Sequence, residues 1–314
     1  MTIPIIFDTD PGIDDAAALS ILLTNSAFDV RLVTTVAGNV SVDKTTLNAL
    51  KLTHYFNRQD VEVARGAEKP LVKPFKDAAA IHGESGMPGY DFGTLSTQTI
   101  ADEAVAAMHQ TIQASHELIT LVAVGAFTNI AMLIQRFPDD LQKIEQLVIM
   151  GGSLSGGNLT SVAEFNVFTD PDAAKIVFES GLSITMLGLD VTEKAVLTTD
   201  SLATLAQINE TGRMLSALFD HYADHTGTGK PMHDVNTLYY LLHPEKYQMR
   251  DIWIDVVTSG PAIGATVGDI LQSTHDTTNA HVALDIDGPA FNAWFLLMVA
   301  QIDDANINAG KLEK

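Results

Sequence analysis

The stretch IIFDTDPGIDD, residues 5–15, is the part of the sequence that decides the fold. An apolar run ends at an aspartate, a Pro-Gly pair follows, and an Ala- and Leu-rich stretch occupies residues 16–23. This order predicts a strand, a tight turn and a helix. The apolar run shows no polar alternation, which is typical of a strand buried on both faces of a parallel sheet. We therefore expect an α/β fold.

The same stretch places four carboxylates, Asp8, Asp10, Asp14 and Asp15, within eight residues. Carboxylates this close repel one another and raise each other's pKa, so we expect a bound cation among them. The simpler alternative is an acidic helix start, because negative charge in the first helical turn suits the helix dipole. Capping needs only one aspartate, so that alternative explains neither Asp8 nor Asp10.

The composition indicates a globular protein that does not bind nucleic acid. The chain has 314 residues and 46% hydrophobic content, enough for a sizeable core in one large α/β domain or two smaller ones. No linker-like segment or internal repeat divides it, so we expect a single domain over residues 1–314. The formal net charge of −21 argues against nucleic acid and against an anionic membrane surface as partners.

The absence of cysteine limits the metal chemistry. Without cysteine the chain has no disulfides, no thiolate nucleophile and no sulfur ligands, so a metal must be held by oxygen or imidazole. Calcium or magnesium is favoured. The sequence starts as a strand without a basic leader, and no apolar stretch approaches the roughly 20 residues needed to span a bilayer. We expect a soluble, cytoplasmic protein.

Short β-branched runs alternate with helical segments along the chain, which predicts parallel strands in a Rossmann-like central sheet flanked by helices. The predicted strands are Ile3–Phe7, Arg31–Val36, Glu62–Ala64, Leu118–Val124, Gln146–Met150 and Ser183–Leu189. The predicted helices are Ala16–Asn25, Val42–Phe56, Ile100–Ala114, Thr128–Arg136 and Ala173–Glu179.

Polar or glycine-rich positions follow four of these strands. Asp10 follows the first, Asn39 the second, and Val124 with its neighbouring glycine ends a later one. The segment Gly151–Phe168, which carries further polar side chains, follows another, and Gly66–Leu95 is a second long segment rich in glycine and polar residues. Each position alone also fits an ordinary turn. Because ligands bind beyond the carboxyl ends of parallel strands, we expect all four to converge on one site.

The sequence resembles the inosine-uridine preferring nucleoside hydrolases in motifs distributed over nearly its whole length. The motifs are DTDPGIDD (8–15), AGN (37–39), IHGESG (81–86), VGAFTNIA (124–131), MGG (150–152), AEFN (163–166), DPDAA (170–174) and HD (233–234). The resemblance implies the fold of that family and cleavage of the N-glycosidic bond of ribonucleosides by a calcium-activated water. It departs from the family's usual pattern at Ala126-Phe127 and Ser161-Val162, where no side-chain ligand is lost.

The resemblance also implies roles for particular residues. The calcium ligands would be Asp10, Asp15, the backbone carbonyl of Val124, and Asp234, an all-oxygen set that suits calcium. Asp10 would also be the general base that takes a proton from water. The residues implied in substrate binding are Asp14, Asn39, His82, Asn158, Glu164, Asn166, His233 and Asp234. Asp8 is expected to support the turn rather than to touch substrate.

The implied reaction is a single displacement through an oxocarbenium-like transition state, which nearby carboxylates stabilise. His233 is the candidate acid for the departing base, because imidazole titrates near neutrality. His82 is a second possible contact with the base, although an exposed loop histidine is a simple alternative. Tyr222 and His225, expected on a preceding amphipathic helix, are weaker candidates for lining the base pocket.

The number and positions of the tryptophans indicate which nucleobases the protein would prefer. The family's purine-specific branch stacks the base between indoles, whereas this chain has only Trp253 and Trp294, both in apolar context near the C-terminus. We therefore expect a pyrimidine-preferring or non-specific enzyme of nucleoside salvage. The resemblance further implies a homodimer or homotetramer.

Two alternatives remain at this point. A phosphatase of the haloacid dehalogenase type also begins with a strand that ends in Asp-x-Asp, but this leaves Asp14, Asp15 and His233 without a role. A non-catalytic, calcium-dependent nucleoside-binding protein would keep the ligands but lack the base and the acid.

Overall fold

The stretch over residues 5–15 forms a buried strand, a turn and a helix, as its sequence predicts. Strand β1 covers Ile3–Thr9, and helix α1 covers Ile13–Thr24. Alternate side chains of β1, such as Phe7 and Ile6, pack into the cores on opposite faces of the sheet. Full burial of such a side chain contributes about 2 kcal/mol, so β1 is anchored from both sides. The structure, a computed structural model, describes residues 2–93, 95, 103–222 and 229–308.

The central sheet has eight strands, seven of which run parallel, while the last is antiparallel to its neighbour. In spatial order they are β3 (Val63–Arg65), β2 (Phe28–Thr35), β1, β4 (Ile119–Ala123), β5 (Ile144–Met150), β6 (Ile184–Leu187), β12 (Ala280–Ile286) and β9 (Tyr247–Ile252). The chain runs outward from β1 to β3 and then returns to place β4 on the other side of β1. Open α/β sheets bind ligands beside such a reversal.

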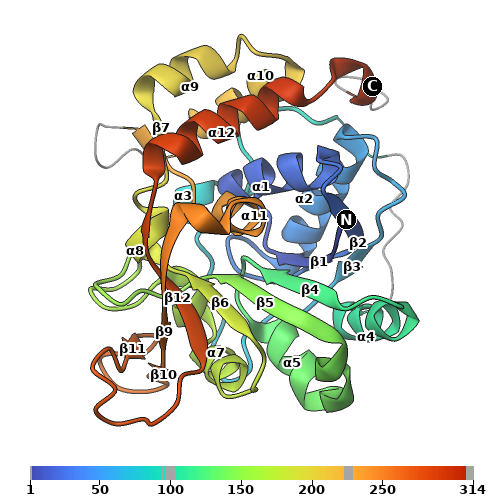
Figure 1. Cartoon of the computed structure of the whole chain (residues 1–314). Coiled ribbons are helices and arrows are strands. Elements are labelled where there is room, and N and C mark those ends of the chain that lie inside the picture. The colour runs from blue at the N-terminus through green and yellow to red at the C-terminus, as the bar shows by residue number, and fades with distance from the viewer. Residues whose placement is uncertain (1, 94, 96–102, 223–228, 309–314) are drawn as a thin grey trace.

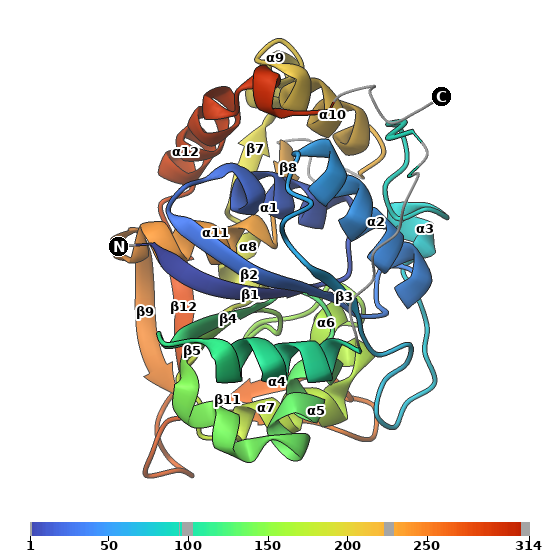
Figure 2. The ribbon, with the colours of Figure 1, turned by 90° about the vertical axis from the view of Figure 1, so that its right-hand side faces the viewer.

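Helices cover both faces of the sheet. Helices α4, α5 and α7 lie on one face, and α1, α2 and α11 lie on the other, with α9, α10 and α12 as a further layer above α1 (Figures 1 and 2). The helices after α1 are α2 (Val42–Tyr55), α3 (Ala79–His82), α4 (Ala104–Ala114), α5 (Thr128–Arg136), α6 (Phe165–Thr169), α7 (Pro171–Phe178), α8 (Leu189–Thr192), α9 (Thr199–Leu205), α10 (Glu210–Phe219), α11 (Val235–Leu242) and α12 (Gly288–Gln301). Short 3-10 helices cover Pro138–Lys143, Pro244–Lys246 and Asp304–Asn306.

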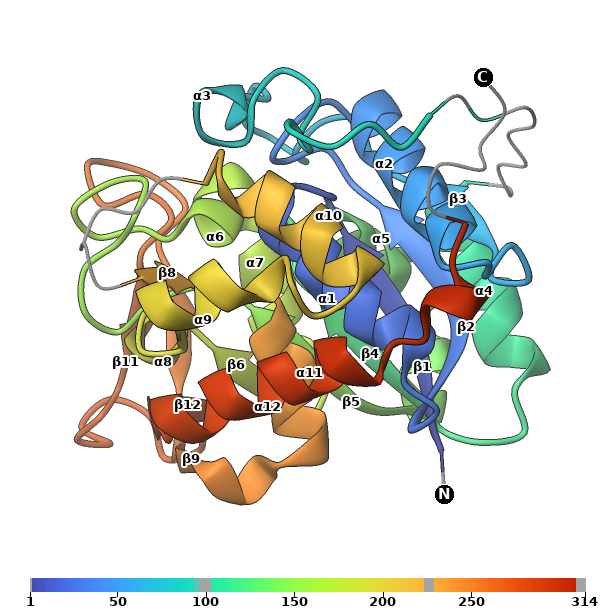
Figure 3. The ribbon, with the colours of Figure 1, turned by 90° about the horizontal axis from the view of Figure 1, so that it is seen from above.

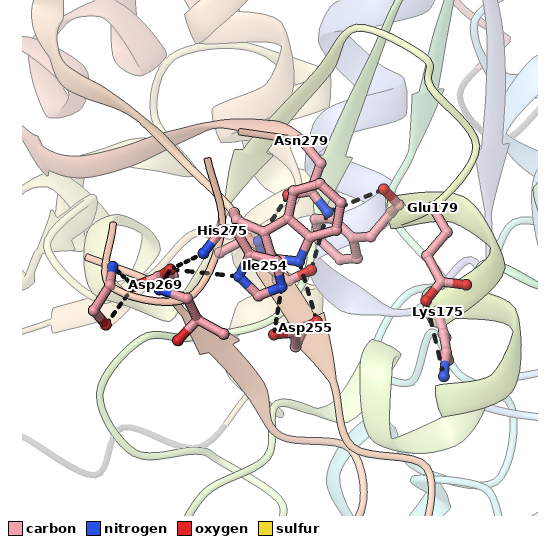
Figure 4. Close-up of polar contacts among 11 residues, drawn as sticks. Lys175, Glu179, Ile254, Asp255, Asp269, His275 and Asn279 are labelled. Carbon is pink, nitrogen blue, oxygen red and sulfur yellow. Dashed lines mark hydrogen bonds and ion pairs between the residues drawn. The ribbon is translucent and has the colours of Figure 1, made fainter. Parts of the chain in front are cut away.

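Two small antiparallel ribbons complete the described structure: β7 (Val196–Thr198) with β8 (Gly229–Pro231), and β10 (Ile254–Val256) with β11 (Thr266–Gly268). The second ribbon is fastened by Asn279, whose amide accepts from the backbone N–H of Ile254 at 2.7 Å and donates to the carbonyl of Phe178 at 3.1 Å. Figure 4 shows Asn279, Ile254 and His275 in this region. The ring of Trp253, the residue before Ile254, stacks on that of His275 with centroids 4.5 Å apart. Trp253 therefore helps to hold the β10–β11 ribbon in place.

The predicted α/β sheet is confirmed, and most differences lie at the element ends. All six predicted strands are present, and α5 has the predicted bounds. Helix α1 starts at Ile13 rather than at Ala16, and Asp14 and Asp15 lie in its first turn, as expected for an acidic helix start. The prediction of two long loops was incomplete, because each segment contains a short helix, α3 or α6. The first three residues of the helix predicted over Ile100–Ala114 lie outside the described residues.

Within the described ranges, no helix is both long and apolar enough to cross a bilayer.

Candidate active site

A cavity of about 350 Å³ lies at the carboxyl edge of the sheet, where the loops after β1, β2, β4 and β5 meet. Seen from above, α3, α6 and β8 lie toward this edge, opposite the amino end of β1 (Figure 3). Nine of the predicted site residues line the cavity: Asp14, Asn39, His82, Val124, Asn158, Glu164, Asn166, His233 and Asp234. The ends of β2, β4 and β5 therefore converge as expected. Asp10 and Asp15 are not among the lining residues, but both are hydrogen-bonded to Asn39, which is.

Asp10 is almost fully buried and is held by the loop after β2. Its Oδ2 accepts the backbone N–H of Asn39 at 2.6 Å, and its carbonyl accepts the Asn39 amide at 3.1 Å. A Cβ at Gly38 would overlap the Asp10 carboxylate, and a Cβ at Gly125 would lie 2.7 Å from its Oδ1. These two glycines therefore let the loops after β2 and β4 close over Asp10.

Asp15 is buried and satisfies several donors around the turn. Its Oδ1 accepts from the Thr9 hydroxyl at 2.5 Å, and its Oδ2 accepts from the Gly12 N–H at 2.9 Å and the Asn39 amide at 3.1 Å. These bonds fix the Pro-Gly turn on the first turn of α1. Asp15 thus joins the strand end, the turn and Asn39 in one network.

Three carboxylates, those of Asp14, Asp15 and Asp234, each offer an oxygen within 4.8 Å of the other two, and all three residues are buried. Burial, followed by the charges of Asp14, Asp15 and Asp10, raises the pKa of Asp234 well above its usual range. Burial and then the charge of Asp15 raise the pKa of Asp14 to about 7. The closest grouping thus includes Asp14, which the resemblance assigns to ribose.

The loop after β5 supplies a second polar wall. Glu164 caps α6, accepting from the N–H groups of Asn166 at 2.8 Å, Val167 at 3.1 Å and Gly152 at 2.9 Å. The Asn166 amide donates to the Val124 carbonyl at 2.8 Å. Asn158 is exposed and accepts from the Phe165 N–H at 3.0 Å. The cap and these bonds orient the loop toward the cavity.

His82 is buried in α3 and is in contact with the aspartate turn. Its Nδ1 accepts the backbone N–H of Ile13 at 3.3 Å, which leaves the ring proton on Nε2 when the ring is neutral. Burial, and secondarily the proximity of His233, lowers the pKa of His82 to about 4. The alternative of a mobile, exposed loop histidine is wrong.

His233 lies in the cavity wall with its Nδ1 2.8 Å from the Thr192 hydroxyl. Burial lowers the pKa of His233 to about 4, so the premise that this imidazole titrates near neutrality is wrong for the free protein. A neutral ring still donates through Nε2 when Thr192 donates to Nδ1. Sequence reasoning missed Thr192, which follows β6 and could have been found by the same strand-end rule.

The predictions for the ring-bearing residues Tyr222, His225 and the two tryptophans have different outcomes. Tyr222 lines the cavity, with its ring centroid 5.9 Å from that of His82, but it lies three residues beyond the end of α10 rather than within the helix. His225 lies outside the described residues. Trp294 is buried in α12, and neither tryptophan lines the cavity. Residues that sequence reasoning did not select also line it, including Ile81, Phe165 and Glu193.

The donor set fits a hard divalent cation. The buried carboxylates of Asp14, Asp15 and Asp234 all offer oxygen donors. Burial raises the pKa of each, and neighbouring carboxylates raise the pKa of Asp14 and Asp234 further. None of the described residues that line the cavity is a lysine or arginine. A divalent cation would offset the repulsion among these carboxylates.

The fold and the site define an α/β protein with an acidic, small-molecule cavity at the switch point of its sheet. Residues 5–293 match the model of the inosine-uridine preferring nucleoside hydrolase family, and the chain belongs to that family. It is 49% identical over 302 residues to the non-specific ribonucleoside hydrolase RihC of Klebsiella pneumoniae subsp. pneumoniae, covering 96% of this chain and 99% of that protein. Identity to the RihC of Escherichia coli O1:K1 / APEC is 46%, with the same coverage.

Solved structures agree with this assignment. A purine-preferring ribonucleoside hydrolase from Gardnerella vaginalis superposes with a TM-score of 0.88 at 28% identity, covering 95% of this chain and 98% of that one. A plant nucleoside hydrolase superposes with a TM-score of 0.89, also at 28% identity, covering 96% of this chain and all of the other. The fold predicted from the sequence is therefore the nucleoside hydrolase fold.

Proposed function

We propose that the protein hydrolyses the N-glycosidic bond of ribonucleosides to the free base and ribose, using calcium and accepting more than one base. The observation that carries this proposal is the arrangement of Asp14, Asp15 and Asp234 around one point, with the buried Asp10 held beside them. A cavity of about 350 Å³ is of the size that small-molecule ligands occupy. Family membership supports the reaction class.

Asp10, Asp15, Asp234 and the Val124 carbonyl would hold the calcium ion. Bound there, calcium would lower the pKa of a water molecule and balance the charge of the carboxylates. Asp10 takes the proton of the attacking water as general base. The hydrogen bond from Asn39 to Asp10 Oδ2 leaves Oδ1 without a hydrogen-bond partner among the described residues, and Oδ1 is available for this step.

The remaining polar residues bind ribose and stabilise the transition state. Asp14, Asn39, Asn158, Glu164 and Asn166 offer acceptors and donors to the sugar hydroxyls. Positive charge that develops on the sugar ring is stabilised by the surrounding carboxylates, as in other glycoside hydrolyses. His233 offers the departing base a hydrogen bond from Nε2, and when its ring is protonated it passes that proton to the base and becomes neutral. His82 contributes a second donor on the same side of the cavity.

The base pocket supports broad specificity. It has Ile81, Phe165 and the ring of Tyr222 but no indole among the described residues that line it. The RihC relatives are named non-specific, which supports a non-specific rather than a pyrimidine-preferring enzyme. A cytoplasmic salvage role and an assembly of two or four copies belong to the same proposal.

The phosphatase alternative requires Asp8 to attack phosphorus. Asp8 is fully buried, bonded to Thr34 and Asn129, and absent from the cavity lining, which argues against that role. The non-catalytic alternative is disfavoured because His233 lines the cavity and the buried Asp10 is hydrogen-bonded to Asn39, which also lines it.

The test is the release of reducing sugar from uridine, cytidine, inosine and adenosine by protein stripped with a chelator, before and after calcium is added. The proposal predicts ribose from both pyrimidine and purine nucleosides, activity that returns only with the added cation, and no dependence on phosphate. Release that is unaffected by stripping would contradict the calcium role, and a lack of release from all four nucleosides would contradict the proposed reaction.

A further inference from the structure

Asn129 lies outside the cavity, and its fully buried side chain ties together three segments of the sheet edge. As the second residue of α5, it donates from Nδ2 to Asp8 Oδ1 at 2.8 Å and to the Thr35 carbonyl at 3.0 Å. Its Oδ1 accepts the backbone N–H of Ala67 at 2.9 Å. Both amide protons and the amide oxygen are therefore used within the protein.

Each of these partners is joined to a segment that carries a predicted cation-binding or substrate-binding group. Asp8 precedes Asp10 by two residues, and the carbonyl of Asp8 accepts the N–H of Val124 at 2.9 Å. Thr35 ends β2, and the chain continues from it to Asn39, whose N–H binds Asp10. The Ala67 carbonyl accepts the N–H of Ala37 at 3.0 Å, two residues before Asn39.

The site around the amide leaves little room for adjustment. A Cβ at Gly66 would overlap both the Asn129 amide and the Thr35 carbonyl, so the backbone after β3 lies directly against this side chain. Asp8 Oδ1 also accepts the Thr34 hydroxyl at 2.5 Å. Loss of the Asn129 amide would remove the side-chain partner of the buried Thr35 carbonyl and of the half-buried Ala67 N–H, and would weaken the connection between the strand ends.

We propose that Asn129 is a positioning residue, which holds the ends of β1 and β2 and the start of α5 so that Asp10 and the Val124 carbonyl stand at the spacing that a divalent cation requires. This inference rests on the calcium site of the proposed function. It predicts that changes at Asn129 weaken cation binding beyond what their effect on folding stability explains. Asn129 does not touch substrate and is not a catalytic residue.

Thr128 offers a matched control. It is the neighbouring residue in α5 and is equally buried, and its hydroxyl donates to a buried carboxylate, Asp170 Oδ2, at 2.7 Å. Asp170 caps α7 and accepts the N–H of Leu71. The hydrogen bond from Thr128 to Asp170 therefore connects α5 to α7 and does not involve Asp10. Thr128→Val removes one buried hydrogen bond and leaves the three hydrogen bonds of Asn129 in place.

The experiment is calorimetric titration of calcium chloride into chelator-stripped wild type, Asn129→Ala, Asn129→Asp and Thr128→Val, with urea unfolding of each metal-free protein. We expect the calcium Kd to rise at least tenfold in both Asn129 variants and less than twofold in Thr128→Val, at similar losses of stability. Asn129→Asp keeps the acceptor for Ala67, so it remains informative if the alanine variant does not fold.

The outcomes separate the two claims. Wild-type protein that binds no calcium would overturn the cation site of the proposed function and this inference with it. Calcium binding by wild type together with an unchanged Kd in a folded Asn129 variant, or with an equal rise in Thr128→Val, would overturn the positioning role alone.

Discussion

At the scale of single residues, the four aspartates of the opening turn have different environments. Asp8 is fixed in the sheet, Asp10 lies under the loops after β2 and β4, Asp15 organises the turn, and Asp14 reaches the cavity. Crowding in the sequence predicted a cation site. It could not predict that the closest three carboxylates would be those of Asp14, Asp15 and Asp234, because that depends on how the segment before α11 packs against α1.

The role of His233 gives a prediction at this scale. His233→Ala should lose about 10²–10³-fold in kcat/KM on uridine, because general acid catalysis typically contributes that much. On p-nitrophenyl riboside, whose leaving group needs no proton, the loss should be less than tenfold. The measurement is steady-state kinetics of wild type and His233→Ala on both substrates. Equal losses on the two substrates would refute the acid role.

At the scale of elements, hydrophobic periodicity predicted the sheet well. Apolar runs such as residues 3–7 and 146–150 lack the polar alternation of a strand with one exposed face, so they are buried on both faces of the sheet. All six predicted strands are present. The element ends were less predictable, because a cap or turn sets them: Glu164 starts α6 inside a segment expected to be a loop. Strands β9 and β12 also escaped prediction, since exposed positions in β9 and half-buried positions in β12 interrupt the apolar pattern.

The site could be predicted where it depends on strand ends, and could not where it depends on contacts between distant elements. Asp10, Asn39 and Val124 converge because parallel strands share a carboxyl edge. The burial of His82 against the Pro-Gly turn and the bond from Thr192 to His233 join segments that no sequence rule brings together. The lowered pKa of both histidines follows from that burial.

At the scale of the whole molecule, the buried carboxylates link folding stability to pH and to cation binding. Burial is the largest cause that raises the pKa of Asp8 and of Asp14 from 3.8 to about 7. When a group has a higher pKa in the folded state than in the unfolded state, its protonation favours the folded state. This contribution to the free energy of unfolding is lost as pH rises through the folded pKa. His82 and His233, whose pKa values are lowered to about 4, are neutral in the folded state above pH 6.5. Because their unfolded forms lose protons near pH 6.5, they offset only part of this effect.

Metal-free protein should therefore lose stability between pH 6.5 and pH 8, by on the order of 1 kcal/mol for each of the two carboxyl groups. Calcium should restore stability, and more so at pH 8, because protons compete with the cation for the same oxygens. Urea unfolding at both pH values, with chelator or with calcium, measures this. A metal-free stability that rises across this range would be inconsistent with the buried, uncompensated carboxylates.

The central claim, that the carboxylate site activates water for hydrolysis of a nucleoside, is tested most directly by ribose release from uridine in Asp10→Ala at saturating calcium, with bound calcium measured in the same samples. The account predicts a loss of at least about 10²-fold in kcat, the lower end of what a general base contributes. Undiminished turnover in Asp10→Ala would contradict it.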